Sequence, residues 1–391
     1  MRISRRFLLA ATAGASLPGR AEERPDRWRE TLAFLQAERA AGTLPGAALV
    51  VRQDGRPALE RYEGTYCGLR RRDEPLDGKV RHPLYSYSKL ISATVVMLAV
   101  QDGLVALDTP VSAYLPQFTG GGKERITLRH LLTHAAGIPN VTIGSVSTEA
   151  GWEAAVAALC AAKTEWEPGS RTAYHGLTGL LVAAEAVRRR TGGKRWEALC
   201  RERLFRPLGA NSLTFEIPEN EPVALTPQPA ELPKTPAEAF PHAGQPAGGC
   251  FGTAADALKV LQLHLDAGRW HGTRLLSEPL AREMRRVQYA REIAAAREAG
   301  KAPDHEPWGL GLLLRGTGPA AGGHGWFGLR DQGSPSVFGH AGIDTVIGVA
   351  DPDRRSALLF ISTASPPSAE KTVALRNGVV NRVFSAVDQR R

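Results

Sequence analysis

The chain has 391 residues and a formal net charge of +9, with 43% hydrophobic and 23% charged residues. This composition is ordinary for a protein with a large buried core, and it excludes collagen, coiled coil and long-range disorder. No apolar run reaches the roughly 18 residues of a membrane-spanning helix. Basic residues are spread along the chain without interleaved aromatic residues, so we expect no nucleic-acid partner.

The first 21 residues have the order of an export signal. Arg2, Arg5 and Arg6 precede a short apolar stretch over 7–15, and small residues suited to cleavage follow. The segment Ser4–Leu9 resembles a twin-arginine signal, which directs export of a folded protein. We therefore expect a periplasmic or secreted protein with residues 22–391 as its folded domain and no stable membrane insertion after signal removal.

The two ends of the domain predict one antiparallel sheet. Apolar spacing predicts a helix over 24–41, and a strand over 46–51 is followed by an Asp-Gly turn and a second strand. Near the other end, strands over 345–350 and 357–361 precede a final helix that starts at about Ser368. We expect the strands of both ends to share a sheet that the terminal helices cover.

The middle of the chain is different, because it contains helical patterns and no good strand between about 100 and 240. Helices are expected over 86–102, 127–133, 152–161, 178–191 and 196–204. The fold class is therefore α/β of the α+β type. An antiparallel sheet flanked by N- and C-terminal helices occupies about 24–100 and 247–391, with an inserted all-helical region over about 101–246.

The tetrad Ser86-Tyr87-Ser88-Lys89 is a candidate nucleophile site. A serine hydroxyl is a weak nucleophile and needs a nearby base or cation. If Ser86 opens a helix, Lys89 lies one turn later with its amine over the hydroxyl. The same spacing recurs at Ser368 and Lys371, where a helix N-cap is the better interpretation. An N-cap is also the alternative for Ser86.

Two later segments could complete such a site. Tyr174 follows a tight turn and precedes a helix, so its phenol could exchange a proton with Ser86 or a leaving group. His340-Ala341-Gly342 leads into the strand at Thr345, where Gly342 would let a substrate lie against the strand edge. The backbone N–H groups of Ser86 and Ile343 could form an oxyanion hole.

These motifs together resemble the serine β-lactamase and penicillin-binding superfamily. The resemblance is to the branch with class C β-lactamases, D-Ala-D-Ala carboxypeptidases, D-aminopeptidases and family VIII esterases. Further matching segments are Leu104–Pro116, Thr127–Pro139, Ala247-Gly248-Gly249 and Trp308-Gly309-Leu310-Gly311. The resemblance implies the β-lactamase/transpeptidase-like fold and a serine hydrolase that needs no cofactor. It implies that Ser86 is acylated, that Lys89 activates it and that Tyr174 shuttles the proton.

Two departures from the family pattern bear on the substrate. Gly176 stands where relatives usually have an Asn that holds the substrate's amide, and Ala341 where they have a Thr or Ser that holds its carboxylate. His340 stands where many relatives have a Lys, so the positive field there depends on pH. We expect an esterase or small-amide hydrolase. A β-lactamase, D-Ala-D-Ala carboxypeptidase or D-aminopeptidase, and a non-catalytic binding or sensing module on the same fold, are the alternatives.

Other motifs predict no further chemistry. His130 and His134 have the spacing of a metal pair, but no third ligand is evident, so we expect no metal. Gly323–Gly328 matches G-x-G-x-x-G without a preceding strand, and we interpret it as a glycine-rich loop. The widely spaced Cys67, Cys160, Cys200 and Cys250 are interpreted as buried small hydrophobic residues rather than disulfide partners.

Overall fold

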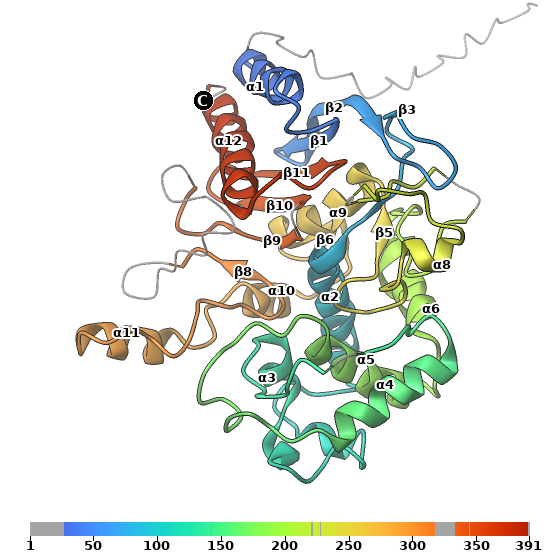
Figure 1. The fold of residues 1–391 in the computed structure, drawn as a ribbon. Coiled ribbons are helices and arrows are strands. Elements are labelled where there is room, and N and C mark those ends of the chain that lie inside the picture. The colour runs from blue at the N-terminus through green and yellow to red at the C-terminus, as the bar shows by residue number, and fades with distance from the viewer. Residues whose placement is uncertain are drawn as a thin grey trace, which may run out of the picture.

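The computed structural model describes residues 27–141, 143–219, 222–226, 228–316, 333–343 and 345–389 (Figure 1). The expected export signal over residues 1–21 lies outside this part of the chain, as does Gly323–Gly328. Both assignments therefore stay predictions.

The strands in chain order are β1 (Gly46–Gln53), β2 (Arg56–Tyr66), β3 (Glu74–Pro75), β4 (His82–Pro83), β5 (Phe251–Gly252), β6 (Arg269–Trp270), β7 (Thr273–Arg274), β8 (Leu313–Leu314), β9 (Phe338–Gly342), β10 (Val346–Asp351) and β11 (Ser356–Ser362). The α-helices are α1 (Arg29–Ala40), α2 (Ser88–Gln101), α3 (Leu128–Leu132), α4 (Glu149–Ala161), α5 (Thr178–Arg190), α6 (Trp196–Cys200), α7 (Arg206–Leu208), α8 (Pro236–Ala239), α9 (Ala254–Leu265), α10 (Glu278–Met284), α11 (Ala290–Glu298) and α12 (Ala369–Asp388). Short 3₁₀ turns are η1 (Tyr85–Tyr87), η2 (Val111–Ala113) and η3 (Lys123–Arg125), and η4 (Arg201–Phe205) is a π-helical turn.

The two ends of the chain form one antiparallel sheet, as the sequence predicts. Its strand order is β3-β2-β1-β11-β10-β9-β8, so β1 from the N-terminal part pairs with β11 from the C-terminal part. β1 and β2 are joined by Asp54 and Gly55, with φ values of 51° and 73°. A two-residue hairpin turn needs these left-handed conformations for the strands to keep their twist.

Helices cover both faces of this sheet (Figure 1). Because strand side chains alternate between faces, Leu49 and Val51 of β1 pack into one core with residues of α1 and α12. Ala48 and Val50 pack into the other core, which includes residues of α2 and α9. The central strands are therefore buried on both sides.

Helix α2 connects the sheet to the helical region (Figure 1). It contacts β9 of the sheet and also α5 and α6 of the helical region. Nearly all of its residues are buried, because it packs against both the sheet and the helical region. The predicted helix over 196–204 is instead divided into α6 and the π-helical turn η4, and α7 follows from Arg206. Between residues 100 and 240 the described part of the chain has only isolated β-bridges and no strand.

The cysteines form no disulfide, and three of the four are buried; Cys160 is partly exposed. Within the described ranges, the structure contains no helix long and apolar enough to cross a membrane. It also contains no cluster of His, Cys, Asp or Glu there that could hold a metal ion.

Ser368 is the N-cap of α12, since its hydroxyl accepts a hydrogen bond from the backbone N–H of Lys371. Ser368→Ala should therefore destabilise the protein by about 1 kcal/mol. The urea midpoint of unfolding measures this loss. Ser277 caps α10 without a side-chain hydrogen bond, so Ser277→Ala should shift the midpoint less. Equal shifts for the two variants would contradict the assigned cap.

Candidate active site

Ser86 lies in η1, directly before α2. The preceding residue, Tyr85, has a φ of 47°, in the left-handed region that non-glycine residues rarely adopt. Ser86 in η1 and Lys89 in α2 lie about one turn apart, and Lys89 Nζ lies 3.2 Å from Ser86 Oγ. The alternative interpretation of Ser86 as the N-cap of α2 is wrong, because Tyr87 occupies that position.

Lys89 is buried, with 1% of its surface exposed. Besides Ser86 Oγ, its amine donates to the carbonyl oxygen of Gly176 at 2.6 Å and to that of Ala247 at 3.0 Å. Burial disfavours the charged form and lowers the pKa of Lys89 to about 7. A large fraction of this amine is therefore neutral at neutral pH and can accept a proton.

Side chains of α2 hold this arrangement against the segment before α9. Ser92 Oγ donates to the carbonyl of Pro246 at 2.6 Å, and Ser88 Oγ accepts from the backbone N–H of Cys250 at 3.1 Å. These two hydrogen bonds fix the segment on either side of Ala247, and so hold the Ala247 carbonyl next to the Lys89 amine. At Gly249 a Cβ would lie only 2.1 Å from the carbonyl oxygen of His242. The Ala247-Gly248-Gly249 motif thus serves a tight backbone turn.

Tyr174 lies in the segment before α5, with its ring over the Lys89 amine. The distance from Lys89 Nζ to the ring centroid is 4.8 Å. His134 and Trp308 pack against the ring at centroid distances of 4.7 and 5.9 Å. Burial raises the pKa of Tyr174 to about 12, although a hydrogen bond with Ser86 acts in the opposite direction. The phenol is therefore protonated at neutral pH.

The end of β9 brings His340, Gly342 and Ile343 to η1, which β9 contacts. His340 is fully buried, and its ring centroid lies 6.5 Å from that of Tyr174. Its Nδ1 lies 2.8 Å from the carbonyl oxygen of Ala341. Because a carbonyl can only accept, Nδ1 carries a proton and donates it to this oxygen. Ile343 is 61% exposed at the strand end.

The packing of β9 on η1 requires a glycine at position 342. A Cβ there would lie 2.6 Å from the carbonyl oxygen of Leu84 and 3.2 Å from Tyr85 Cβ. The glycine lets β9 pack directly on η1, and the expected approach of a substrate to this strand edge stays a prediction. From α12, the buried Arg376 donates through Nη2 to the carbonyl oxygens of Gly342 and Val346, which fixes the same strand end.

Sequence reasoning missed two residues of the loop after α3. His134 has a φ of 58°, and its Nδ1 accepts a hydrogen bond from the His175 backbone N–H at 3.1 Å. Asn140 Oδ1 accepts from the backbone N–H of Gly176 at 2.9 Å. The Thr127–Pro139 motif contains His134, but the sequence indicates only a possible metal ligand at this position. Nothing in the sequence distinguished Asn140.

The His130 and His134 pair does not converge on a metal position. His130 Nδ1 accepts from the backbone N–H of Thr127 in a capping box at the start of α3. His134 Nδ1 accepts from the backbone N–H of His175, so each of the two rings has a structural hydrogen bond.

Burial lowers the pKa of His175 to about 4, and the nearby Lys89 charge acts in the same direction. The His175 side chain is therefore neutral at neutral pH.

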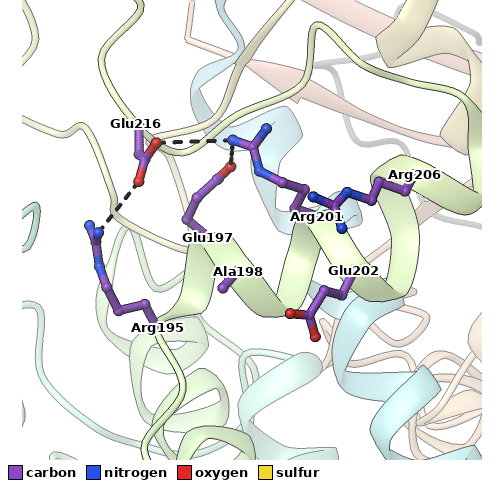
Figure 2. A pocket seen from close by; sticks show the side chains of 7 residues that line it. All are labelled: Arg195, Glu197, Ala198, Arg201, Glu202, Arg206 and Glu216. Atoms are coloured by element: carbon purple, nitrogen blue, oxygen red, sulfur yellow. Dashed lines mark hydrogen bonds and ion pairs between the residues drawn. The ribbon is translucent and has the colours of Figure 1, made fainter.

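A separate pocket lies on α6 and η4 (Figure 2). It is lined by Arg195, Arg201, Glu197 and Glu216, among others, and includes neither Ser86 nor Lys89. Arg195 pairs with Glu216 at 3.4 Å, and Arg201 pairs with Glu197 and Glu216. The charged side chains of this pocket thus pair with one another, and no serine is among its lining residues.

A serine hydroxyl beside a buried amine and a phenol is typical of enzymes that form an acyl-serine. The chain belongs to the Beta-lactamase family, whose family model matches residues 33–380. This is a family of hydrolases with esterase, carboxypeptidase and acyltransferase members.

Several named relatives cover most of the chain. It is 28% identical to Esterase EstB of Burkholderia gladioli, over 87% of this chain and 91% of that protein. It is also 28% identical to Penicillin-binding protein 4 of Amycolatopsis lactamdurans, over 66% and 68%. A penicillin-binding protein homologue from Caulobacter crescentus has a TM-score of 0.74 at 21% identity, covering 92% of this chain and 98% of the other. A family VIII carboxylesterase structure has a TM-score of 0.72 at 23% identity, covering 91% and 98%. These two structures confirm the expected β-lactamase/transpeptidase-like fold.

Gly342→Ala should separate β9 from η1, because the new methyl group meets the Leu84 carbonyl. Since displacements near 1 Å at a reacting centre are costly, we expect kcat of the hydrolase to fall at least roughly ten-fold. Gly144 has open space around it and no positive φ, so Gly144→Ala is the control and should keep wild-type kcat. Wild-type kcat in Gly342→Ala would contradict the packing described for β9.

Proposed function

We propose that the protein is a serine hydrolase that forms an acyl-enzyme on Ser86 and acts on uncharged esters or small amides. The observation that carries the proposal is the 3.2 Å distance between Ser86 Oγ and the buried Lys89 Nζ. The esterases among the relatives support this class of substrate. A neutral amine beside a serine hydroxyl is the arrangement that activates the hydroxyl without a histidine.

In the acylation step the neutral Lys89 amine accepts the Ser86 proton while Oγ forms a bond to the substrate's carbonyl carbon. The carbonyl oxygen becomes an oxyanion, for which the backbone N–H groups of Ser86 and Ile343 are the proposed donors. Tyr174 is protonated and gives its proton to the leaving oxygen or nitrogen as that bond breaks. The Lys89 ammonium then reprotonates the phenol, which returns both groups to their initial state. Water attacks the acyl-enzyme by the reverse sequence of proton transfers.

Lys89 rather than Tyr174 is the first proton acceptor in this scheme. Their pKa values, lowered to about 7 for Lys89 and raised to about 12 for Tyr174, leave only the amine partly deprotonated at neutral pH. A general base is most effective when its pKa lies near the working pH. The phenol is then the proton donor to the leaving group.

The side chains around the site favour a substrate without a carboxylate. Ala341 of β9 has no hydroxyl, and Gly176 has no amide side chain. Arg376 reaches the end of β9, but it is buried and its Nη2 donates to two backbone carbonyls. An uncharged acyl group therefore has a smaller desolvation cost on binding than an anionic one.

The close alternative is a β-lactam or a D-amino-acid peptide as substrate. Relatives named Beta-lactamase in Yersinia enterocolitica and D-alanyl-D-alanine-carboxypeptidase/endopeptidase AmpH in Escherichia coli keep this alternative open. It would use the same acylation groups. A cephalosporin distinguishes it from the ester.

Ser86→Ala should abolish hydrolysis of p-nitrophenyl butyrate, because the nucleophilic oxygen is absent. The intact mass of the wild type after brief exposure to the ester should show a butyryl adduct, and that of Ser86→Ala should show none. A chromogenic cephalosporin should also acylate the wild type, but this adduct should be hydrolysed only slowly. Ser368→Ala is the matched control and should turn over the ester normally. Ester turnover by Ser86→Ala would sink the proposal. Fast cephalosporin turnover would favour the alternative, and no adduct from any serine probe would favour a binding module.

The kcat/KM for the ester should rise with pH through about 7. Below that pH Lys89 is an ammonium and cannot accept the Ser86 proton, whereas above it the amine is neutral. Lys89→Met removes the titrating group and should lower kcat/KM by at least about a hundred-fold. The limb of the pH profile, that is, the rise of kcat/KM with pH near 7, should then be absent. A wild-type rate that stays constant between pH 5 and 9 would contradict Lys89 as the base.

A further inference from the structure

The loop after α3 holds the backbone on both sides of Tyr174. The carbonyl of His134 accepts from the N–H of Ala173 at 3.0 Å, and its Nδ1 accepts from the N–H of His175 at 3.1 Å. Asn140 Oδ1 then accepts from the N–H of Gly176 at 2.9 Å. Three backbone N–H groups around the phenol are thus held by two residues of one loop.

Gly176 is the point where this support reaches Lys89. Its N–H donates to Asn140, and its carbonyl accepts from Lys89 Nζ at 2.6 Å. A glycine has no side chain to fix its backbone, and here a Cβ would meet nothing closer than Asn140 Oδ1 at 3.7 Å. The direction of the Gly176 carbonyl therefore depends on the hydrogen bond to Asn140.

Among the residues that the structure describes, no acidic side chain forms an ion pair with the Lys89 amine. Around it lie Ser86 Oγ and the Ala247 carbonyl, the Tyr174 phenol, and the rings of His175 and, beyond Tyr174, of His340. Burial lowers its pKa. The carbonyls of Gly176 and Ala247 are then the principal groups that stabilise its ammonium form.

We propose that Asn140 is a positioning residue, which holds the Gly176 carbonyl on the Lys89 amine and so places that amine on Ser86. This inference rests on the proposed role of Lys89 as the base. Asn140 itself is exposed and touches neither Ser86 nor Lys89 through any hydrogen bond within the described ranges. It acts through Gly176.

Two substitutions at Asn140 should move the pH profile in opposite directions. In Asn140→Ala the Gly176 carbonyl is released, so the ammonium loses a stabilising acceptor and the limb of kcat/KM shifts to lower pH. Asn140→Asp keeps an acceptor for Gly176 and adds a negative charge near Lys89, so the limb shifts to higher pH, by up to about one unit. With p-nitrophenyl butyrate we expect kcat to fall about ten-fold in Asn140→Ala, with KM within two-fold of wild type.

Asn211 is an exposed asparagine outside the site, so Asn211→Ala and Asn211→Asp are the matched controls, with wild-type profiles expected. Thermal unfolding of all four variants shows whether each is folded at the assay temperature. The proposal would be overturned if kcat and the pH of the limb were unchanged in both Asn140 variants. It would also be overturned if the limb shifted in the same direction in both variants. A wild type without any limb between pH 5 and 9 would overturn the role of Lys89 as well, which separates failure of this inference from failure of the proposed function.

Discussion

The buried amine of Lys89 is the contact on which the rest of the site depends. It joins η1 through Ser86, the segment before α5 through Gly176, and the segment before α9 through Ala247. Those three segments come from far-apart parts of the chain. The sheet and the helical region must both be in place around α2 before the amine has its partners, so the fold and the site form together.

Burying an amine is unfavourable unless it is hydrogen-bonded, and the structure balances these two effects. Three oxygen acceptors keep the ammonium form accessible, while exclusion of water lowers its pKa to about 7. A more exposed lysine would stay protonated at neutral pH. A buried lysine without hydrogen-bond acceptors would not be held next to Ser86. The same enclosure keeps Tyr174 protonated. One desolvated site thus gives the amine and the phenol complementary proton states.

Much of the fold could be predicted from the sequence because its signals are local. The Asp54-Gly55 turn and the short apolar runs in β1 and β11 indicate strands, and Ser368 marks the start of α12. The spacing of Ser86 and Lys89 and the place of Tyr174 also predicted which residues meet. Asn140 and the packing of Gly342 on Leu84 could not be predicted, because both are contacts between distant segments. The α-helix begins at Ser88 rather than at Ser86, because the chain first forms the 3₁₀ turn η1, which the sequence did not predict.

The account is tested most directly by the rate at which an uncharged alkyl fluorophosphonate labels Ser86 as a function of pH. Labelling requires the nucleophile and its base but no later step, so it isolates the Ser86 and Lys89 pair. We expect the rate to rise with an apparent pKa near 7 in the wild type and to fall to background in Lys89→Met. Labelling that is independent of pH, or undiminished in Lys89→Met, would contradict the central role of the buried amine.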